Sequence, residues 1–510
     1  MIFRNVLSNW VGLVVLGAIS FILTPILIHG LGELYFGMWV LVSSLVDYYG
    51  LMDIGLRATV QRYVAHLRGA KDQDGLDQTI ATALVFTLGI SAIIFVSVFG
   101  LSWALPHFFK LQGASIPLFR LLVILMGVDM AVTLPARLLG TFLCSVERFD
   151  LYNLSGIVSG IIRAVLLVIV LWLGYGVIGV AAVTLAVASL SIPFLWWLVK
   201  RAEPGLRVLW HRASWARARQ LFSFSFFVSL NTVGYQLRNY TDALVIGRML
   251  SVALVTSFNV ATRLMEYFRQ IIVGFTGPLL PAFSGLEGRN RAEDVRGLFL
   301  VSTRITMTLS TFIASMLLLN GREFLRFWVG AKYVSSYPIL AILTIGTVAS
   351  LAQGPSTGLL IARGRHKFLG ILTLCEGITN LCLSIYWARR YGLVGVALGT
   401  TVPMLVSSLG ILPWYVMRVA KVTFREYFTS ALGRPLAAAL IFAAVGFAAH
   451  TVWSEPNILA FLSLLAVESL VFAVLAFTLC FGTLERQALL AKGKHLAVVL
   501  RVANLYAKLG

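Results

Sequence analysis

Charged residues are scarce in this sequence. Only 12% of its 510 residues are aspartate, glutamate, lysine or arginine, whereas 59% are hydrophobic and the mean hydropathy is +0.89. So little charge cannot cover the surface of a water-soluble protein of this length. Apolar runs long enough to cross a bilayer as helices recur along the chain. They lack the period-two alternation of barrel strands, which favours an all-α polytopic membrane protein.

Cysteine is rare, and the motifs of familiar enzyme sites are missing. Cys144, Cys375, Cys382 and Cys480 lie in apolar segments without C-x-x-C spacing, which favours free thiols over a disulfide framework or a metal site. The sequence contains no G-x-x-x-x-G-K-[ST], H-E-x-x-H or G-x-S-x-G motif. We therefore expect no catalytic residue, no metal ligand and no cofactor, and we do not expect an enzyme.

Acidic residues are few, and basic residues are unevenly placed. Lysine and arginine number 41 against 21 aspartates and glutamates, which gives a formal net charge of +20. Most basic residues fall in alternate connections between apolar runs, at 62–71, 199–220, 289–296, 363–367 and 418–434, and in the C-terminal tail. The other connections hold only Lys110, Arg248, Arg322, Arg326, Lys332, Arg389 and Arg390. The positive-inside rule therefore predicts a cytoplasmic (inner) membrane protein with both termini in the cytoplasm.

The apolar runs divide into about 14 predicted helices. They are expected near 10–29, 38–64, 79–104, 116–143, 154–173, 176–198, 221–249, 253–284, 298–320, 336–362, 368–388, 392–416, 435–453 and 458–482. The polar segment before the seventh helix sets Trp210 and Trp215 among arginines. This pattern is typical of an amphipathic helix on the cytoplasmic leaflet, and a plain basic loop is an equally good interpretation.

The sequence repeats itself. Asp47-Tyr48-Tyr49 matches Glu266-Tyr267-Phe268, and Arg148-Phe149 matches Lys367-Phe368, each at an offset of 219 residues. Both repeats begin on the same predicted side of the membrane, which indicates parallel repeats of six helices each. The predicted domains are a six-helix bundle at 1–200, a cytoplasmic amphipathic linker at 201–220, a second six-helix bundle at 221–417, two further helices at 418–483 and a basic cytoplasmic tail at 484–510.

Ionisable residues inside the apolar runs are the candidates for function, because each is costly unless it faces a partner or water. The arginines are Arg57, Arg120, Arg137, Arg163, Arg238, Arg263, Arg269 and Arg304, and the acids at comparable depth are Asp47, Asp53, Asp129, Asp242, Glu266, Glu376 and Glu468. Arg120, Arg137 and Arg304 lie near helix ends, where we expect the long side chain only to extend to the membrane interface. Steps of three and four residues place side chains on one helix face. Such sets are Asp47, Gly50, Ile54, Arg57 and Gln61 in 38–64, then Asn231, Tyr235, Arg238 and Asp242 in 221–249, then Asn259, Arg263, Glu266 and Arg269 in 253–284.

We interpret these faces as the lining of a central, polar, net cationic cavity. The expected substrate-binding residues are Arg57, Arg263, Arg269, Arg238, Asn231 and Asn259. The expected ion-coupling residues are Asp47, Asp53, Asp242 and Glu266. In the alternative interpretation the same side chains only neutralise one another in a packed bundle, as Asp53–Arg57, Arg238–Asp242 and Arg263–Glu266–Arg269.

Two segments resemble a known family. GMWVLVSSLVDYYGLMDIGLRATVQRYVAHLRG and NYTDALVIGRMLSVALVTSFNVATRL are similar to the two halves of Wzx-type polysaccharide and O-antigen flippases, in the multidrug/oligosaccharidyl-lipid/polysaccharide (MOP) exporter superfamily. The resemblance covers roughly residues 1–417. It implies two six-helix bundles in a V shape, alternating access, and a polyprenyl-pyrophosphate-linked oligosaccharide as the substrate for cell-surface polysaccharide biosynthesis. It also implies lumen arginines, for which Arg57 and either Arg263 or Arg269 occupy matching regions, but the first-helix arginine of the peptidoglycan-precursor branch is missing.

Other function classes stay open on the sequence. An ion-coupled drug or organic-cation antiporter of the same superfamily would favour net acidic charge, whereas arginine at least balances the acids here. A non-transporting scaffold of a polysaccharide export complex would leave the buried charges without a purpose. A membrane polymerase or glycosyltransferase normally needs a large extracytoplasmic loop. We expect as partners a lipid-linked oligosaccharide, membrane lipids, a proton or sodium ion, and other polysaccharide-assembly proteins, but no nucleic acid.

Overall fold

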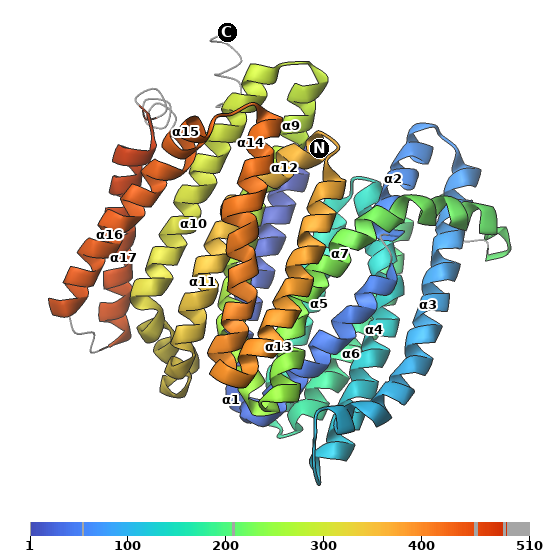
Figure 1. The fold of residues 1–510 in the computed structure, drawn as a ribbon. Coiled ribbons are helices and arrows are strands. Elements are labelled where there is room, and N and C mark those ends of the chain that lie inside the picture. Colours follow the sequence, from blue (N-terminus) through green and yellow to red (C-terminus); the bar gives the residue numbers. More distant parts are fainter. Residues whose placement is uncertain (1, 54–55, 207–209, 453–456, 483–485, 487–510) are drawn as a thin grey trace. The chain divides into compact units, whose positions relative to one another are not determined.

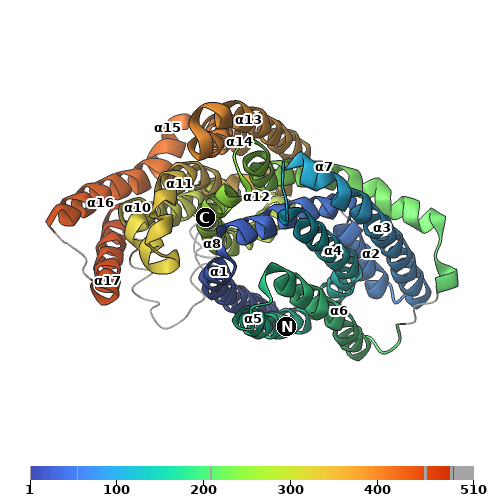
Figure 2. The same ribbon diagram turned by 90° about the horizontal axis from the view of Figure 1, so that it is seen from below.

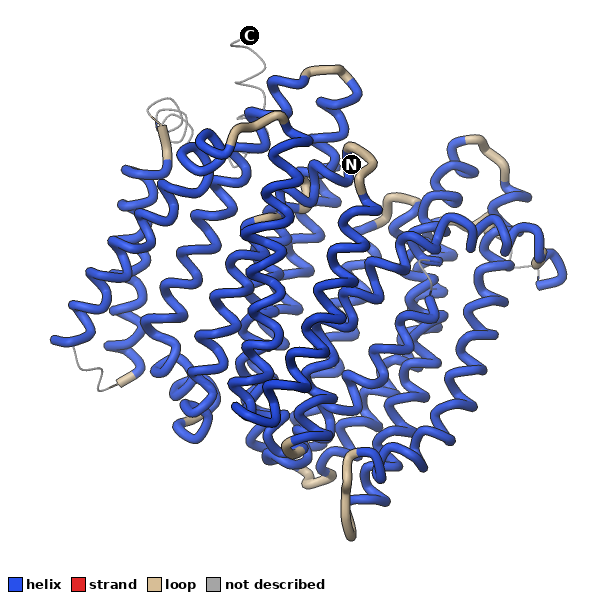
Figure 3. The backbone as a smooth tube through the Cα atoms, in the orientation of Figure 1, coloured by secondary structure: helices blue, strands red, loops and turns tan. Residues whose placement is uncertain are grey.

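The chain is helical throughout the part that the structure describes. The computed structural model describes residues 2–53, 56–206, 210–452, 457–482 and 486. Every regular element in these ranges is a helix (Figure 3). The chain groups into two compact units, which are described separately below. Unit 1 comprises Met1–Asn259, Thr373–Leu381 and Ala388–Leu393, and unit 2 comprises Val260–Leu372, Cys382–Trp387 and Val394–Gly510.

Unit 1 is built from long helices of the N-terminal half. Its elements are α1 (Ile2–Asp47), η1 (Tyr48–Asp53), α2 (Leu56–Gly69), α3 (Gln73–Phe108), α4 (Ser115–Ser145), α5 (Phe149–Trp172), α6 (Gly176–Ala202), η2 (Trp210–Arg212), α7 (Trp215–Met249), the start of α8 (Val252–Thr276) and two short stretches of α13 (His366–Leu405). Helix α4 packs against α3 and α6, and α1 lies beside α5 (Figure 2). Val60, Leu76, Phe142 and Leu198 meet in a buried apolar cluster shared by α2, α3, α4 and α6.

The contact between α3 and α4 depends on a glycine. A Cβ atom on Gly127 would lie 2.2 Å from Cγ2 of Val98, closer than side chains approach one another. Lipid is as apolar as leucine, so helices in a membrane associate through close van der Waals packing, which small residues permit. Gly127 therefore brings the two backbones together where a larger residue would separate them.

Unit 2 is arranged around α10 (Ala292–Val329). The other elements are the rest of α8, α9 (Leu279–Gly288), η3 (Ala331–Ser336), α11 (Tyr337–Ala352), α12 (Gly354–Ala362), the remainder of α13, η4 (Val406–Ile411), α14 (Leu412–Ala420), α15 (Phe424–Tyr427), η5 (Phe428–Leu432), α16 (Gly433–Val452), α17 (Ile458–Leu475) and η6 (Ala476–Cys480). Helix α10 contacts α9, α11, α12, α16 and α17 (Figure 1). The rings of Phe299 and Tyr427 stack with centroids 5.9 Å apart in a buried cluster with Phe283 and Val416.

The apolar helices confirm the prediction of a polytopic all-α membrane protein. Within the described ranges, 11 segments are long and apolar enough to cross a membrane. His366–Ala420 contains the predicted spans 368–388 and 392–416, and Ser8–Met52 contains 10–29 and the first part of 38–64, because the backbone leaves helical angles only locally, at Gly392 and Gly32. Helix α7 is not among the 11, since asparagine, glutamine and arginine interrupt its apolar residues. Composition alone therefore leaves the number 14 approximate.

The prediction of one continuous helix over 38–64 is wrong. Helix α1 ends at Asp47, the tighter 3₁₀ helix η1 follows, and α2 begins at Leu56. A 3₁₀ helix turns by a different angle per residue from an α-helix, so the predicted stripe from Asp47 to Gln61 does not share one helical face. The predicted Asp53–Arg57 pair is not tested, because the Asp53 side chain lies outside the described residues. Ile54 lies outside the described residues.

The predicted linker at 201–220 contains no separate amphipathic helix in its described part. It forms a single 3₁₀ turn at η2, and α7 already begins at Trp215. Two of its residues contact α3, because Arg212 pairs with Asp74 at 2.7 Å and the Trp215 ring stacks on Phe86 with ring centroids 5.6 Å apart. Trp210 is 54% exposed and Trp215 76% exposed, as expected for tryptophans at a membrane surface. The domain boundaries themselves stay predictions.

Candidate functional site

Side chains of α3 and α7 form hydrogen bonds with the junction between α1 and η1 in unit 1. The hydroxyl groups of Tyr48 and Thr241 lie 2.6 Å apart, and those of Tyr49 and Ser97 lie 2.8 Å apart. Gln236 Nε2 donates to the Asp47 carbonyl oxygen at 3.0 Å. Carbonyls at a helix end have no partner in their own helix, so this amide satisfies one of them. The polar contacts therefore stabilise the change from α1 to η1.

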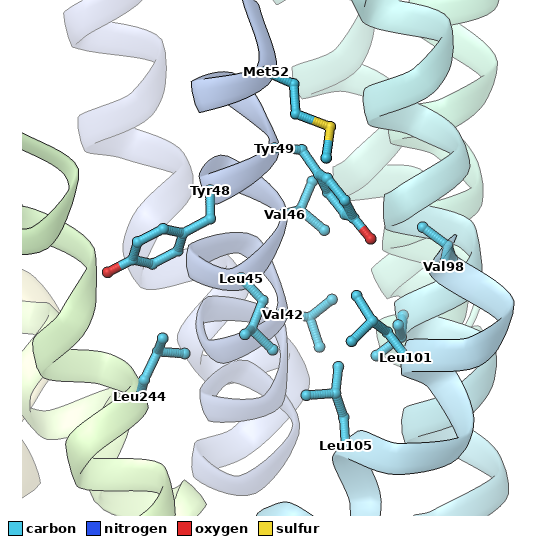
Figure 4. Close-up of a pocket in the computed structure, with 11 residues that line it drawn as sticks. Val42, Leu45, Val46, Tyr48, Tyr49, Met52, Val98, Leu101, Leu105 and Leu244 are labelled. Carbon is cyan, nitrogen blue, oxygen red and sulfur yellow. The ribbon is translucent and has the colours of Figure 1, made fainter. Parts of the chain in front are cut away.

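An apolar pocket lies beside this break. Its volume is about 400 Å³, and its walls come from α1, η1, α3, α4 and α7. Figure 4 shows the Tyr48 and Tyr49 rings diverging, the first toward Leu244 and the second toward Val98. Leu101 and Leu105 close the pocket on the side of α3. The pocket carries no charge, so it is separate in character from the ionisable residues of α7.

Arg238 of α7 pairs across unit 1 with a glutamate that the helical spacing did not indicate. Arg238 Nη1 lies 3.0 Å from Glu376 Oε1, and the Glu376 side chain is only 7% exposed. Asn380 Nδ2 donates to the Arg238 carbonyl oxygen at 3.2 Å. The helices approach closely here, since a Cβ atom on Gly377 would lie 2.9 Å from the carbonyl oxygen of Gly234. The expected salt bridge from Arg238 to Asp242 is corrected, because the partner is Glu376 on α13.

The other candidate residues of unit 1 are spread over several elements. Asp242 is buried on α7, and Asp47 is half-buried at the end of α1. Arg57 is exposed in the first turn of α2. Asn259 is half-buried on α8. The side chains of Asn231 on α7 and Asp53 on η1 lie outside the described residues.

Of the charged residues of α8 in unit 2, Glu266 and Arg269 form an ion pair, and Arg263 does not take part in it. Arg269 donates to Glu266 through two bonds, Nε to Oε2 at 2.7 Å and Nη2 to Oε1 at 2.6 Å. Gln270 Nε2 adds a third bond to Glu266 Oε1 at 3.1 Å. Arg263 is half-buried, and it makes no hydrogen bond or ion pair in the described part of the chain. The expected chain Arg263–Glu266–Arg269 is therefore only half formed.

The arrangement provides ion pairs and amide donors rather than a metal or nucleophile site. Among the described residues, no three histidine, cysteine, aspartate or glutamate side chains gather as metal ligands would. Sequence reasoning missed the contacts of Glu376, Gln236 and Gln270. Glu376 was visible as an acid within an apolar run, but its contact with Arg238 spans 138 residues. Spacing along one helix cannot indicate such a pair.

Known proteins resemble the chain in sequence. A family model described as "Polysaccharide biosynthesis protein" matches residues 36–338. The uncharacterized membrane protein EpsK of Bacillus subtilis (strain 168) is 21% identical over 474 residues, which cover 92% of this chain and 94% of that protein. A putative O-antigen transporter of Shigella flexneri is 21% identical over 434 residues, which cover 82% of this chain and 99% of that protein.

Solved structures of two transporters resemble this chain in fold. The lipid II flippase MurJ in an inward closed conformation superposes with a TM-score of 0.70 at 14% identity, over 93% of this chain and 98% of that one. A multidrug resistance MATE family transporter of the MOP superfamily, in an inward-facing conformation, gives a TM-score of 0.68 at 17% identity, over 80% of this chain and 96% of that one. At such identities the likeness concerns the fold alone. Because the family model matches more than half of its length, the chain belongs to the polysaccharide biosynthesis protein family, and its fold resembles that of MurJ and of the MATE transporter.

Proposed function

We propose that this protein is a flippase that moves a lipid-linked oligosaccharide, carried on polyprenyl pyrophosphate, across the cytoplasmic membrane for cell-surface polysaccharide biosynthesis. Its family and the O-antigen transporters that it resembles support this class of substrate. Transport proceeds by alternating access, in which the substrate site opens to one side of the membrane at a time. Both termini lie in the cytoplasm, as the distribution of arginine and lysine indicates.

The observation that carries the proposal is the uncompensated charge of Arg263. Its guanidinium lies in an apolar membrane span, is half-buried, and has no partner among the described residues. A charge in this position is costly unless a ligand or water meets it, and such residues mark substrate pathways. An anionic pyrophosphate matches the planar fork of arginine, which binds two phosphate oxygens at once. Arg57, exposed at the start of α2, is the second proposed phosphate contact.

We propose that Arg269 and Glu266 form the switch that couples substrate to an ion. The bidentate pair is only about one third exposed, so both charges are partly removed from water. A phosphate that reaches Arg269 competes with Glu266, and the released carboxylate then accepts a proton or a sodium ion. Exchange follows because each ligand favours a different state of the same pair. Asp47, Asp53 and Asp242 are proposed as further ion-coupling acids.

The remaining polar residues are assigned supporting roles. Arg238 is held by Glu376, and we propose that it orients α7 toward the substrate instead of binding phosphate alone. Asn231 and Asn259 are proposed as donors to the sugar hydroxyls. Other polysaccharide-assembly proteins are expected to supply the substrate and to consume the product.

The test begins with a deletion strain. Mass spectrometry should detect a lipid-linked oligosaccharide that accumulates on the cytoplasmic leaflet, and the intact gene should remove it. Arg57→Ala, Arg263→Ala and Arg269→Ala should each restore no export although the protein reaches the membrane, and lysine at these positions should restore only part. Arg120→Ala is a matched control, because it also removes a half-buried arginine, one that lies over the Trp103 ring at 5.4 Å. Normal export by all three alanine variants would refute the proposal.

A drug or organic-cation antiporter is the second candidate, because the MATE transporter has the same fold. A cationic substrate would need an acid without a partner, whereas Glu266 and Glu376 are both engaged by arginines. Transport assays with cationic dyes in vesicles that contain the purified protein distinguish the two functions. Uptake of dye that depends on Glu266 and not on Arg263 would favour the antiporter.

A further inference from the structure

A second group of arginines lines a cavity in unit 2, apart from the charges of α8. The cavity measures about 750 Å³, and Glu287, Arg363, Arg365, Tyr415, Arg418 and Val419 contribute to its lining. These residues come from α9, α14 and the connection between α12 and α13. Three arginines against one glutamate leave the lining with two uncompensated positive charges. The function proposed above makes no use of them.

A glycine turn places two of these arginines. Gly364 has φ +71°, which side chains disfavour, and it ends α12. The Gly364 amide donates to the Ile361 carbonyl at 2.9 Å, and the Arg365 amide donates to the Leu360 carbonyl at 2.8 Å. This pair of bonds is the Schellman pattern of a helix C-terminus. The turn therefore holds Arg363 and Arg365 in fixed positions on either side of Gly364.

The Arg363 side chain bonds to two other walls of the cavity. Its Nε donates to Glu287 Oε1 at 2.6 Å, and its Nη1 donates to the Val419 carbonyl oxygen at the end of α14. The side chain is only 22% exposed. It therefore joins three elements and is neutralised by Glu287, so the two charges that remain belong to Arg365 and Arg418.

Arg365 and Arg418 are exposed and available to a ligand. Arg365 forms no hydrogen bond or ion pair through its side chain within the described ranges. The Arg418 guanidinium carbon lies 4.0 Å from the centroid of the Trp414 ring, which orients it without neutralising it. Helix α13 begins at His366, directly after Arg365, so its first amide groups add positive potential at the same place.

The surroundings indicate a ligand at a membrane surface. Trp414 is 50% exposed on α14, and Phe368 stacks on Tyr415 with ring centroids 3.8 Å apart. Aromatic rings concentrate at the interface between lipid headgroups and water. Both connections that carry these arginines are predicted to be cytoplasmic, and the cytoplasmic leaflet is anionic. Arginines in a cytoplasmic connection can serve only to set the orientation of the protein in the membrane. That role requires neither a cavity around them nor a bound partner, whereas these arginines line a cavity.

We propose that this cavity binds the phosphate group of an anionic lipid headgroup, with Arg365 and Arg418 as its two charged donors. Two guanidinium groups can hold the oxygens of one phosphate in two-point contacts, which a single lysine charge cannot reproduce. A phospholipid of the leaflet and a polyprenyl carrier present the same phosphate chemistry. The site itself does not depend on the transport function proposed above.

Native mass spectrometry of the purified full-length protein tests the site. Phosphatidylglycerol, zwitterionic phosphatidylcholine and a polyprenyl pyrophosphate are added separately, and the retained lipid is counted. We expect the anionic lipids to be retained over phosphatidylcholine, and Arg365→Gln and Arg418→Gln each to weaken retention roughly tenfold. Arg365→Lys with Arg418→Lys should recover part of it. Lys421→Gln with Arg425→Gln removes two charges outside the lining and should leave retention unchanged.

The outcomes of this experiment either identify which of the two lipids binds the cavity or reject the proposed site. Retention of phosphatidylglycerol that is lost in the double variant Arg365→Gln/Arg418→Gln identifies a leaflet phospholipid. Retention of the polyprenyl pyrophosphate alone, with the same loss, identifies the carrier lipid. Equal retention by the two double glutamine variants would show general attraction to basic surface residues and would overturn the proposal. Failure of the unmodified protein to prefer anionic lipids would overturn it as well.

Discussion

Asn320 of α10 donates its side-chain amide to Glu468 of α17 at 2.6 Å, and both side chains are buried. His450 of α16 meets the other carboxylate oxygen at 3.2 Å. These three residues connect the last two predicted helices to α10, and the Phe312 and Phe472 rings of α10 and α17 lie with their centroids 4.9 Å apart and their planes tilted by 43°. Polar groups that bond across helices stabilise packing in a membrane, where apolar surface gives no net drive to associate.

Removal of the Glu468 carboxylate should loosen α16 and α17 from α10. Glu468→Ala leaves the buried Asn320 amide with only the weakly accepting Met316 sulfur at 3.9 Å, which costs about 1–3 kcal/mol. Glu468→Gln keeps an oxygen acceptor for Asn320 and should cost less. Thermal unfolding of the purified protein in detergent measures both variants, with the 88% exposed Glu293→Gln as the control. Equal stability of the alanine and glutamine variants would show that the bond from Asn320 contributes little.

The Arg238–Glu376 pair should matter more to stability when one partner is removed than when both are replaced. Arg238→Ala removes the guanidinium that pairs with the buried Glu376 carboxylate and should destabilise the protein by about 3–5 kcal/mol. The double variant Arg238→Met/Glu376→Leu should unfold close to the unmodified protein, because apolar groups of similar size replace both charges. Chemical denaturation in detergent gives the comparison.

Export by the same double variant separates structure from function. If the pair only orients α7, a stable double variant should still export polysaccharide at a reduced rate. Complete loss of export in a variant of normal stability would assign Arg238 to the substrate itself.

The close contact of α3 and α4 should lose stability when a methyl group is added at Gly127 and regain it when side-chain volume is removed at Val98. Gly127→Ala places a methyl group against Val98 and should destabilise by about 1–3 kcal/mol through overpacking. Val98→Ala in the same chain should restore most of that loss, because it removes the atoms that would clash. Thermal unfolding of the two single variants and the double variant forms the cycle. An additive result, with no recovery in the double variant, would contradict the packing argument.

The predicted topology can be tested by single-cysteine labelling. Cys144, Cys375, Cys382 and Cys480 are first replaced by alanine. Ala216→Cys, near the start of α7, should react with a membrane-impermeant maleimide only after cells are opened, because that end is predicted to be cytoplasmic. Ser335→Cys in η3 should react in intact cells. The reverse pattern would invert the orientation proposed here.

The fold class followed from the sequence because its cause is local. Bilayer thickness requires long apolar segments, and backbone groups in lipid must bond within their own helix. Each condition concerns consecutive residues, so the apolar runs predict helices without knowledge of tertiary structure. The spacing of Glu266 and Arg269 likewise predicts their ion pair, since i and i+3 share a face.

Only the tertiary structure decided where the charges meet and where helices break. Arg238 reaches Glu376 across 138 residues, a distance that no helical period encodes. The change from α1 to η1 at Tyr48 depends on Thr241, Ser97 and Gln236, which lie on other helices. The segment 38–64 therefore reads as one helix in the sequence, although partners from α3 and α7 stabilise a break in it. The sequence determined that the chain forms long apolar helices, and contacts between distant helices decided which of their charges are satisfied, because a buried charge is stabilised by whatever group packs against it.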